Sequence, residues 1–314
     1  MNQKRIVIAG GSGFIGRVLA EEFSARNFEV IILTRAPHGR ADGIREVAWN
    51  GKKLGGWVQF VDGAEAVINL AGKNINCPHT PKNVFKITAS RVDSVNAIAD
   101  ALAQVKVPPR VWVQASAVGF YGDTGNHIRD ENFPSGENTL AEICRQWEAA
   151  FDSTTVPQTR KVVLRIGFVL GRDGGALPLL SRLAKFYLGG AAGSGRQYIS
   201  WIHLADLVQM FVTVVKRETL AGTFNAVAPG AVTNAEFMGE LRRVLDRPWS
   251  PPAPEFAVRL GAWLFNFEPS LALVSQRCSA DKFLEVDFQF QFPQLRAALE
   301  NLCPKKNASP AHPP

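Results

Sequence analysis

The sequence predicts a protein of the α/β class, with a doubly wound parallel sheet as its main body and a small α+β lobe in its C-terminal part. Two observations predict this arrangement. The first half of the chain alternates short apolar runs with segments of helical periodicity. The runs are apolar at nearly every position, as in a sheet that helices cover on both faces. Such an alternation builds right-handed βαβ units, so the expected fold is Rossmann-type.

The expected elements follow one another with short connections. Strands are expected at residues 5–10, 29–35, 64–72, 110–117, 161–171 and 223–229, and helices at 14–27, 90–104 and 140–153. After Gly171 the pattern is less regular and richer in glycine and proline. We therefore expect a first domain over residues 1–170, to which a segment at about 200–228 returns. A lobe over 171–302 and a disordered tail over 303–314 would complete the chain.

Composition narrows the function classes. The chain has 314 residues and a net charge of +7, but no run of five basic residues, so we expect no nucleic-acid partner; a basic surface suits an anionic cofactor equally well. The four cysteines lie far apart without a CxxC pair, which indicates free thiols and no metal site. No apolar run is long enough to span a membrane, and the first strand begins at once, so we expect a cytoplasmic protein without a membrane partner.

A glycine-rich turn, "IAGGSGFIG", joins the first strand to the first helix and places Gly10, Gly13 and Gly16 in GxxGxxG spacing. Without Cβ atoms the backbone can bend sharply and approach a pyrophosphate, to which the helix N-terminus offers unpaired N–H groups. The strand before it and the helix after it make dinucleotide binding the expected role, with Phe14 and Ile15 beginning the helix. The alternative is a structural turn.

Thr34 and Arg35 end the second expected strand. An NAD-binding fold usually has an acidic residue there for the ribose diol, whereas a guanidinium pairs with a 2′-phosphate. We therefore favour NADP(H) over NAD(H), the alternative being an exposed Arg35 that contacts nothing. Small residues at Leu70, Ala71 and Gly72 are suited to passing an adenine or ribose. Ser90-Arg91 is expected to begin a helix from which Arg91 reaches a phosphate. For both stretches the alternative is a plain packing or solvent-exposed role.

The stretch "SAVGFYGD", residues 116–123, looks like the catalytic serine turn of a nucleotide-cofactor reductase. With the glycine turn and "NLAG" at 69–72, it resembles the extended short-chain dehydrogenases/reductases. Five further blocks resemble the atypical branch called epimerase family proteins: "CRQWEAA" (144–150), "LRIGFVLGRDGGAL" (164–177), "GSGRQYISWIHLADL" (193–207), "FNAVAPGAVTNAEF" (224–237) and "FQFPQLRAAL" (290–299).

The resemblance implies an NADP(H)-binding domain with a lobe over the nicotinamide end. It implies that Thr34 and Arg35 hold the adenosine ribose phosphate, that Leu70 and Ala71 line the adenine and ribose, and that Arg91 and Phe168 contact the cofactor. The segment 73–83 departs from the pattern, because it lacks a basic–aromatic pair and is a residue shorter. Contacts from that segment therefore stay open.

The acid–base pair of the wider superfamily, Tyr-x-x-x-Lys, is absent from the sequence. Four residues after Tyr121, Tyr187 and Tyr198 stand Gly125, Ala191 and Ile202. Alignment on "YGD" places the pair on Glu142 and Gln146, and the usual serine on Ala117. Ser116 and Tyr121 remain candidates for catalysis, each with a structural alternative: a strand-end hydroxyl for Ser116 and a pocket-shaping ring for Tyr121.

Three residues of the block 193–207 are further candidates. Arg196 would bind an anionic substrate or simply sit in a glycine-rich connection, and His203 and Asp206 fit a structural role better than a catalytic one. The sequence thus predicts an NADP(H)-binding reductase acting on an unidentified small substrate. The alternative is a non-catalytic NADPH-binding sensor or partner-binding protein.

Overall fold

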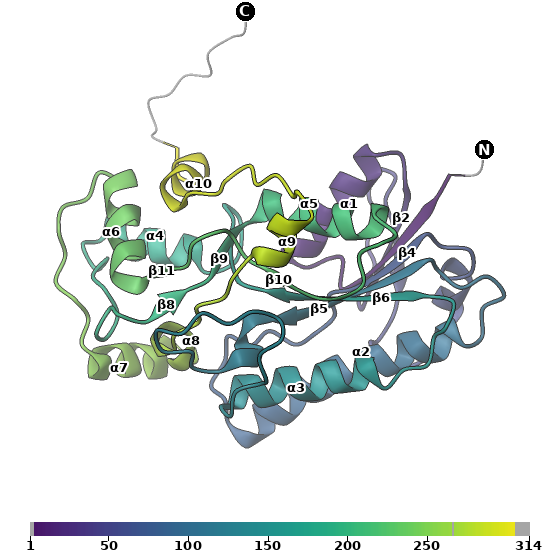
Figure 1. Cartoon of the computed structure of the whole chain (residues 1–314), viewed down its shortest axis with the longest axis horizontal. Coiled ribbons are helices and arrows are strands. Elements are labelled where there is room, and N and C mark those ends of the chain that lie inside the picture. The colour runs from purple at the N-terminus through teal and green to yellow at the C-terminus, as the bar shows by residue number, and fades with distance from the viewer. Residues whose placement is uncertain (1–2, 266, 305–314) are drawn as a thin grey trace, which may run out of the picture.

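A seven-stranded parallel sheet forms the centre of the molecule (Figure 1). The computed structural model describes residues 3–265 and 267–304. The strands lie in the order β10 (Gly222–Ala226), β6 (Arg160–Ile166), β5 (Val111–Ala117), β4 (Ala66–Asn69), β1 (Arg5–Ala9), β2 (Glu29–Thr34) and β3 (Arg45–Ala48). Chain order reverses between β1 and β4, which is the switch point of a doubly wound sheet, so the predicted fold class is confirmed.

Helices cover both faces of this sheet. Helices α1 (Phe14–Ala25) and α5 (Leu204–Lys216) contact each other on one face, and α2 (Pro81–Leu102) and α3 (Thr139–Asp152) do so on the other (Figure 1). Strand β1 is consequently fully buried from Ile6 to Ala9. Two short 3-10 helices, η1 (Gly56–Phe60) and η2 (Val118–Tyr121), complete this half of the chain.

Of the remaining elements, most lie beyond the carboxyl ends of the strands, whereas α9 (Asp281–Glu285) packs beside β10 (Figure 1). They are β7 (Phe168–Leu170), α4 (Leu177–Lys185), β8 (Tyr198–Ile199), β9 (Trp201–His203), β11 (Val232–Thr233), α6 (Asn234–Val244), α7 (Glu255–Phe265), α8 (Ser270–Leu273), α9 (Asp281–Glu285) and α10 (Leu295–Leu302). Strand β7 pairs with β9, and β8 pairs with β11. Within the described part of the chain, no helix combines the length and apolarity needed to cross a membrane.

Residues 275–279 run back along the loop that follows β5. The backbone N–H of Thr124 donates to the carbonyl of Ser275 at 2.9 Å, and that of Arg129 donates to the carbonyl of Arg277 at 2.9 Å. The N–H of Ser279 donates in turn to the carbonyl of Arg129 at 3.1 Å. The C-terminal part is therefore joined to the sheet by backbone hydrogen bonds as well as by apolar contacts.

Two expected boundaries are wrong. The helix expected to begin at Ser90 begins at Pro81, because Thr80 caps it by accepting the N–H of Asn83 and proline fits a first helical position. The strand expected over 161–171 is two strands, β6 and β7, which separate at Gly167. A side chain at Gly167 would collide with the carbonyl oxygen of Ser200, so the chain turns away from the sheet there. The expected tail lies outside the described residues from 305 onwards.

Candidate functional site

The glycine turn at the end of β1 packs directly on the turn at the end of β4. Gly10 has φ +76°, and a Cβ on it would lie 2.9 Å from the carbonyl carbon of Leu70. A Cβ on Gly16 would lie 2.5 Å from the Cα of Gly11. Only glycine fits at these two positions, so the sequence specifies a close approach of two backbones at the switch point of the sheet.

The first turn of α1 leaves its backbone N–H groups available. Gly13 is the N-cap and provides no capping side chain, and no acidic residue stands in the first turn. Such an N-terminus carries unpaired donors and the positive end of the helix dipole, which together bind phosphate. The ring of Phe14 packs against Gly171, Gly174 and Gly175, while Ile15 packs on the core. A ligand at this turn would therefore meet the backbone N–H groups of Phe14 and Ile15 and not their side chains.

Thr34 and Arg35 lie at the end of β2, beside the glycine turn. The Thr34 hydroxyl is 3.1 Å from the hydroxyl of Ser12, which belongs to that turn. Arg35 is exposed and, among the described residues, makes no hydrogen bond or ion pair. Its guanidinium is thus free to pair with an anion next to the turn.

The segment 70–72 is shaped by a buried asparagine that the sequence analysis did not single out. The Asn69 amide oxygen accepts the N–H of Ala71 at 3.0 Å, and the amide nitrogen donates to Ser94 and Gln114. Because Asn69 is fully buried, these bonds fix the turn that faces Gly10.

Arg91 lies in the middle of α2 and still reaches this segment. A Cβ on Gly72 would be 3.1 Å from the guanidinium carbon, and Nη1 donates to the carbonyl of Lys73 at 3.0 Å. The guanidinium also lies 4.9 Å from the centre of the Trp147 ring. Burial lowers its pKa, and no carboxylate contacts it in the part of the chain that the structure describes. Arg91 is therefore an enclosed cation suited to an anionic ligand.

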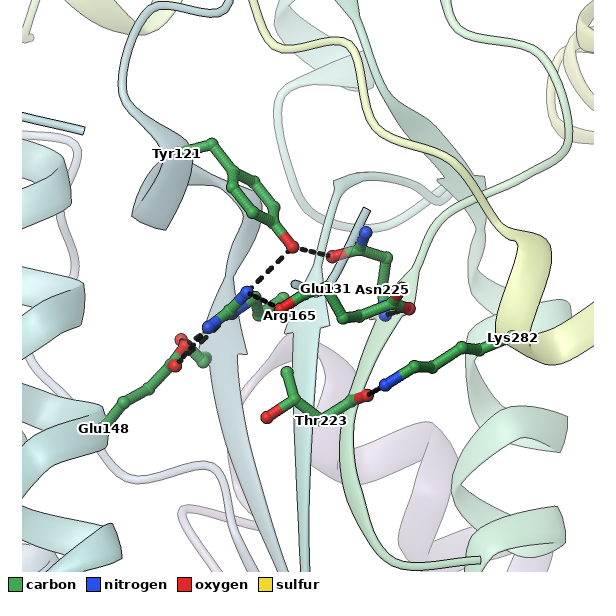
Figure 2. Close-up of polar contacts among 8 residues, drawn as sticks. Tyr121, Glu131, Glu148, Arg165, Thr223, Asn225 and Lys282 are labelled. Atoms are coloured by element: carbon green, nitrogen blue, oxygen red, sulfur yellow. Dashed lines mark hydrogen bonds and ion pairs between the residues drawn. The ribbon is translucent and has the colours of Figure 1, made fainter. Parts of the chain in front are cut away.

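Ser116 and Tyr121 belong to one buried polar cluster, and Figure 2 shows the part of it around Tyr121, Glu148, Arg165 and Asn225. The Ser116 hydroxyl donates to Glu148 Oε1 at 2.5 Å, and the Glu148 carboxylate pairs with Arg165 at 2.8 Å. Arg165 Nη1 donates to the Tyr121 hydroxyl at 2.8 Å, and that hydroxyl donates to Asn225 Oδ1 at 2.8 Å. Figure 2 shows Tyr121, Glu148, Arg165 and Asn225 converging from η2, α3, β6 and β10, and Ser116 joins them from β5.

Within the cluster, the hydroxyls of Ser116 and Tyr121 both donate their protons to protein groups. Tyr121 is only 3% exposed, and burial raises its pKa above the ordinary value, so the phenol keeps its proton. The Ser116 proton is directed at Glu148, which leaves its lone pairs to receive a hydrogen bond. The expectation that either residue is catalytic stays a prediction. A signal for the cluster was present in the sequence, because Arg165 interrupts the apolar run of its strand.

The positions that alignment assigned to the missing acid–base pair lie on the outside of α3. The Glu142 carboxylate pairs with Arg145 on the adjacent turn and accepts a hydrogen bond from the Gln146 amide at 2.5 Å. Gln146 is exposed. Such pairs between neighbouring turns are usual on a solvent-facing helix surface. Neither position therefore provides a buried acid or base.

Phe168 begins β7 and lies next to the carboxyl end of the sheet. Its N–H donates to the carbonyl of Ser200 at 2.7 Å, and its half-buried ring meets Phe237 edge-on at 5.8 Å.

His203 and Asp206 make structural contacts. The His203 imidazole Nδ1 accepts the N–H of Ala205, and the Asp206 carboxylate accepts the N–H groups of Gln291 and Phe292.

A cavity of about 340 Å³ lies in the C-terminal part. It is lined by residues 193, 194 and 197, by Glu255 and Arg259 of α7, and by residues 268–270, 273 and 274. Arg196 is exposed in the same loop, and its backbone N–H donates to the Ser194 hydroxyl at 3.2 Å. This volume is at the lower end of small-molecule sites. Among the described residues, no cluster of His, Cys, Asp or Glu could hold a metal ion.

The segment 73–80 connects the cavity in the C-terminal part to the sheet. The N–H of His79 donates to Glu268 Oε2 at 2.9 Å, so the turn after β4 is connected to a residue that lines the cavity.

Comparison with known proteins agrees with this geometry. Residues 6–226 match the model of the NAD dependent epimerase/dehydratase family, and residues 253–302 match a domain of unknown function, DUF1731. The chain belongs to the NAD dependent epimerase/dehydratase family. Within that family it is 33% identical over 308 residues to the chloroplastic epimerase family protein SDR39U1 homolog of Arabidopsis thaliana, covering 95% of this chain and 86% of the relative. It is 32% identical over 305 residues to the human epimerase family protein SDR39U1, covering 95% and 99%.

Solved structures of the family share the fold. The crystal structure of human SDR39U1 (isoform 2) with NADPH has a TM-score of 0.85 and 30% identity, covering 95% of this chain and 99% of that chain. The UDP-N-acetylglucosamine 4-epimerase of Bacillus cereus has a TM-score of 0.73 at 16% identity, which shows the fold alone.

Proposed function

We propose that this family member binds NADP(H) across the carboxyl ends of β1, β2 and β4. The observation that carries the proposal is the glycine turn at the switch point, where two backbones meet and the α1 N-terminus has free N–H groups. The pyrophosphate would lie on Gly10, Gly13 and Gly16, with the ribose and adenine along Leu70, Ala71 and Gly72. Arg91 would contact the cofactor at the same segment. The NADPH found with human SDR39U1 supports this assignment.

The preference for NADP(H) over NAD(H) rests on Thr34 and Arg35. The Arg35 guanidinium, which has no partner among the described residues, provides at the end of β2 the bidentate donor that a 2′-phosphate requires. A carboxylate for the ribose diol would occupy this position in a site selective for NAD(H).

We further infer hydride transfer between the nicotinamide and a small substrate that enters from the cavity side of the molecule. Phe168 would lie beside the nicotinamide, and Arg196 would attract an anionic substrate. NADP(H) supplies the hydride when bound. The chain's own residues would hold the reacting oxygen and direct the proton, and Ser116 and Tyr121 lie in the buried cluster where that oxygen would be oriented.

A second candidate function, a non-catalytic NADP(H)-binding sensor, is favoured by the occupied hydroxyls. Ser116 and Tyr121 both use their protons inside the protein, and the positions aligned with the acid–base pair lie on the solvent-facing side of α3. Both candidates require the same cofactor site.

One experiment separates them. The purified protein is titrated with NADPH and NADH by calorimetry, and NADPH oxidation is then followed over a panel of carbonyl compounds and sugar nucleotides. Binding with turnover that is lost in Ser116→Ala or Tyr121→Phe supports the reductase. Binding without turnover on any member supports the sensor, and no binding of either dinucleotide rules out both.

A further inference from the structure

An amine and a thiol meet in the segment directly after the proposed cofactor-binding turn. Lys73 Nζ lies 3.3 Å from Cys77 Sγ. Two tight turns between them produce this contact: the N–H of Asn76 donates to the Asn74 side chain at 2.8 Å, and the N–H of Cys77 donates to the carbonyl of Ile75 at 2.8 Å. The backbone thus holds the two side chains together.

The other cysteines have different surroundings. Cys144 and Cys278 are buried, and burial raises the pKa of each thiol to about 12. Cys303 lies 3.7 Å from the hydroxyl of Ser181. In the part of the chain that the structure describes, Cys77 is the thiol in contact with an amine, and it is half-buried, so solvent oxidants can reach it.

We propose that Lys73 and Cys77 are a modification site at which a peroxide oxidant creates a covalent N–O–S bridge. A first molecule of hydrogen peroxide oxidises the thiol to a sulfenic acid and is reduced to water. A second molecule accepts two electrons from the sulfenic acid and the neutral amine together, so that the sulfenic oxygen bonds to nitrogen and two waters leave. The pair therefore gains one oxygen and loses two hydrogens. A single bridging oxygen spans more of the 3.3 Å gap than a direct N–S bond would.

The bridge regulates the cofactor site, and this part rests on the proposed NADP(H) binding. Lys73 follows Gly72 directly, its carbonyl accepts Arg91 Nη1 at 3.0 Å, and its N–H donates to the Ser90 hydroxyl at 2.8 Å. The bridged nitrogen is far less basic than an amine, so oxidation removes a positive charge next to an anionic cofactor. We expect NADPH affinity to fall about fivefold, as for the loss of one exposed charge interaction.

Peptide mass spectrometry tests the bridge. The reduced protein is treated with hydrogen peroxide and digested with trypsin without a reducing agent. Trypsin does not cleave after a modified lysine, so the bridged protein gives one peptide over residues 54–82, whereas the reduced protein gives 54–73 and 74–82. The bridge predicts the 54–82 peptide with one added oxygen and two fewer hydrogens, and its reversal by dithiothreitol. Normal cleavage with only a sulfenic or sulfinic acid on Cys77 overturns it, as does loss of two hydrogens without added oxygen.

Three variants serve as controls. Cys77→Ser and Lys73→Arg should both prevent the bridge, the second while keeping the positive charge. Cys303→Ser should leave bridge formation unchanged. A 54–82 product with the same mass change in Cys77→Ser would contradict the assignment.

NADPH titration of the reduced and oxidised proteins separates this inference from the proposed function. Failure of the reduced protein to bind NADPH would overturn the proposed function. The bridge itself would still be tested by peptide mass spectrometry. Equal affinity of the reduced and the fully bridged protein overturns the regulatory role. A loss of affinity on oxidation that is absent in Lys73→Arg and Cys77→Ser supports it.

Discussion

Glu148 and Arg165 form a buried ion pair in which a carboxylate of α3 meets a guanidinium of β6 at 2.8 Å. Both side chains are less than a tenth exposed, and Arg165 also lies 3.5 Å from the centre of the Phe120 ring. Burying two charges is costly, and the cost is offset here because Arg165 donates to Tyr121 as well as to Glu148.

We predict that Glu148→Gln lowers the free energy of unfolding by about 3–5 kcal/mol, because the substitution leaves Arg165 buried without its counter-charge. Urea unfolding followed by circular dichroism measures the change. Glu142→Gln is the matched control on the same helix, where an exposed carboxylate should matter by less than about 0.5 kcal/mol. Equal destabilisation by both substitutions would refute the role of the pair.

Arg35→Ala should weaken NADPH binding about tenfold or more while changing NADH binding by less than about twofold. The reason is that a charge-assisted hydrogen bond to a 2′-phosphate contributes about 1.5–3 kcal/mol, and NADH has no such phosphate. Calorimetric titration with both dinucleotides gives the comparison. Arg110→Ala, at the amino end of β5 and paired with Glu218 on the surface, should affect neither. Equal weakening for both dinucleotides would remove the 2′-phosphate assignment.

Two glycine-to-alanine substitutions in helices should have opposite signs. Gly239 lies within α6 and has open space where a Cβ would stand, so Gly239→Ala should stabilise by about 0.5–1 kcal/mol. In Gly16→Ala the new methyl would meet the backbone of Gly11 at 2.5 Å, which should destabilise the protein and displace the glycine turn. Thermal unfolding and dinucleotide titration of both variants test this. A stabilised Gly16→Ala variant that retains cofactor binding would show that the turn does not require close backbone contact.

His203 should make stability depend on pH. Burial lowers its pKa below the ordinary value of about 6.5, and Nδ1 must be unprotonated to accept the N–H of Ala205 at the start of α5. The folded protein therefore disfavours the protonated form. This contribution is present above about pH 6.5 and is lost as pH falls through the folded-state pKa.

The substitution His203→Asn tests this dependence, because an asparagine side chain caps a helix without titrating in this range. As pH falls from 7 to 5, the free energy of unfolding of the wild-type protein should decrease relative to that of the variant, because only the wild type has the titrating cap. A difference that is independent of pH would contradict the assignment of His203 as a neutral cap.

The sequence pattern was sufficient for features that depend on neighbours in the chain. Apolar runs and the GxxGxxG spacing predicted the parallel sheet and the turn before α1, because strand burial and glycine geometry are local properties. Local signals were also missed. Thr233 and Glu236 form a capping box that marks the start of α6, and Thr80-Pro81 marks the start of α2.

Features that depend on distant residues could not be predicted in this way. The split between β6 and β7 comes from the contact of Gly167 with Ser200. The apolar residues of the sequence continue across this point, so the split is not visible in the sequence pattern. The partners of Ser116 and Tyr121 come from α3, β6 and β10, and one sequence without aligned relatives gives no information on which polar residues meet. This is why the glycine turn was predicted and the use of the two hydroxyls was not.

The backbone bonds between residues 275–279 and the loop after β5 have a consequence for engineering. Thr124 and Arg129 are each hydrogen-bonded to the segment 275–279. The loop therefore takes its shape partly from residues more than a hundred positions later in the chain. Exchanging the C-terminal part for that of another family member would leave this loop without its template. A functional chimera therefore has to carry both segments from the same parent, and its natural crossover points lie outside them.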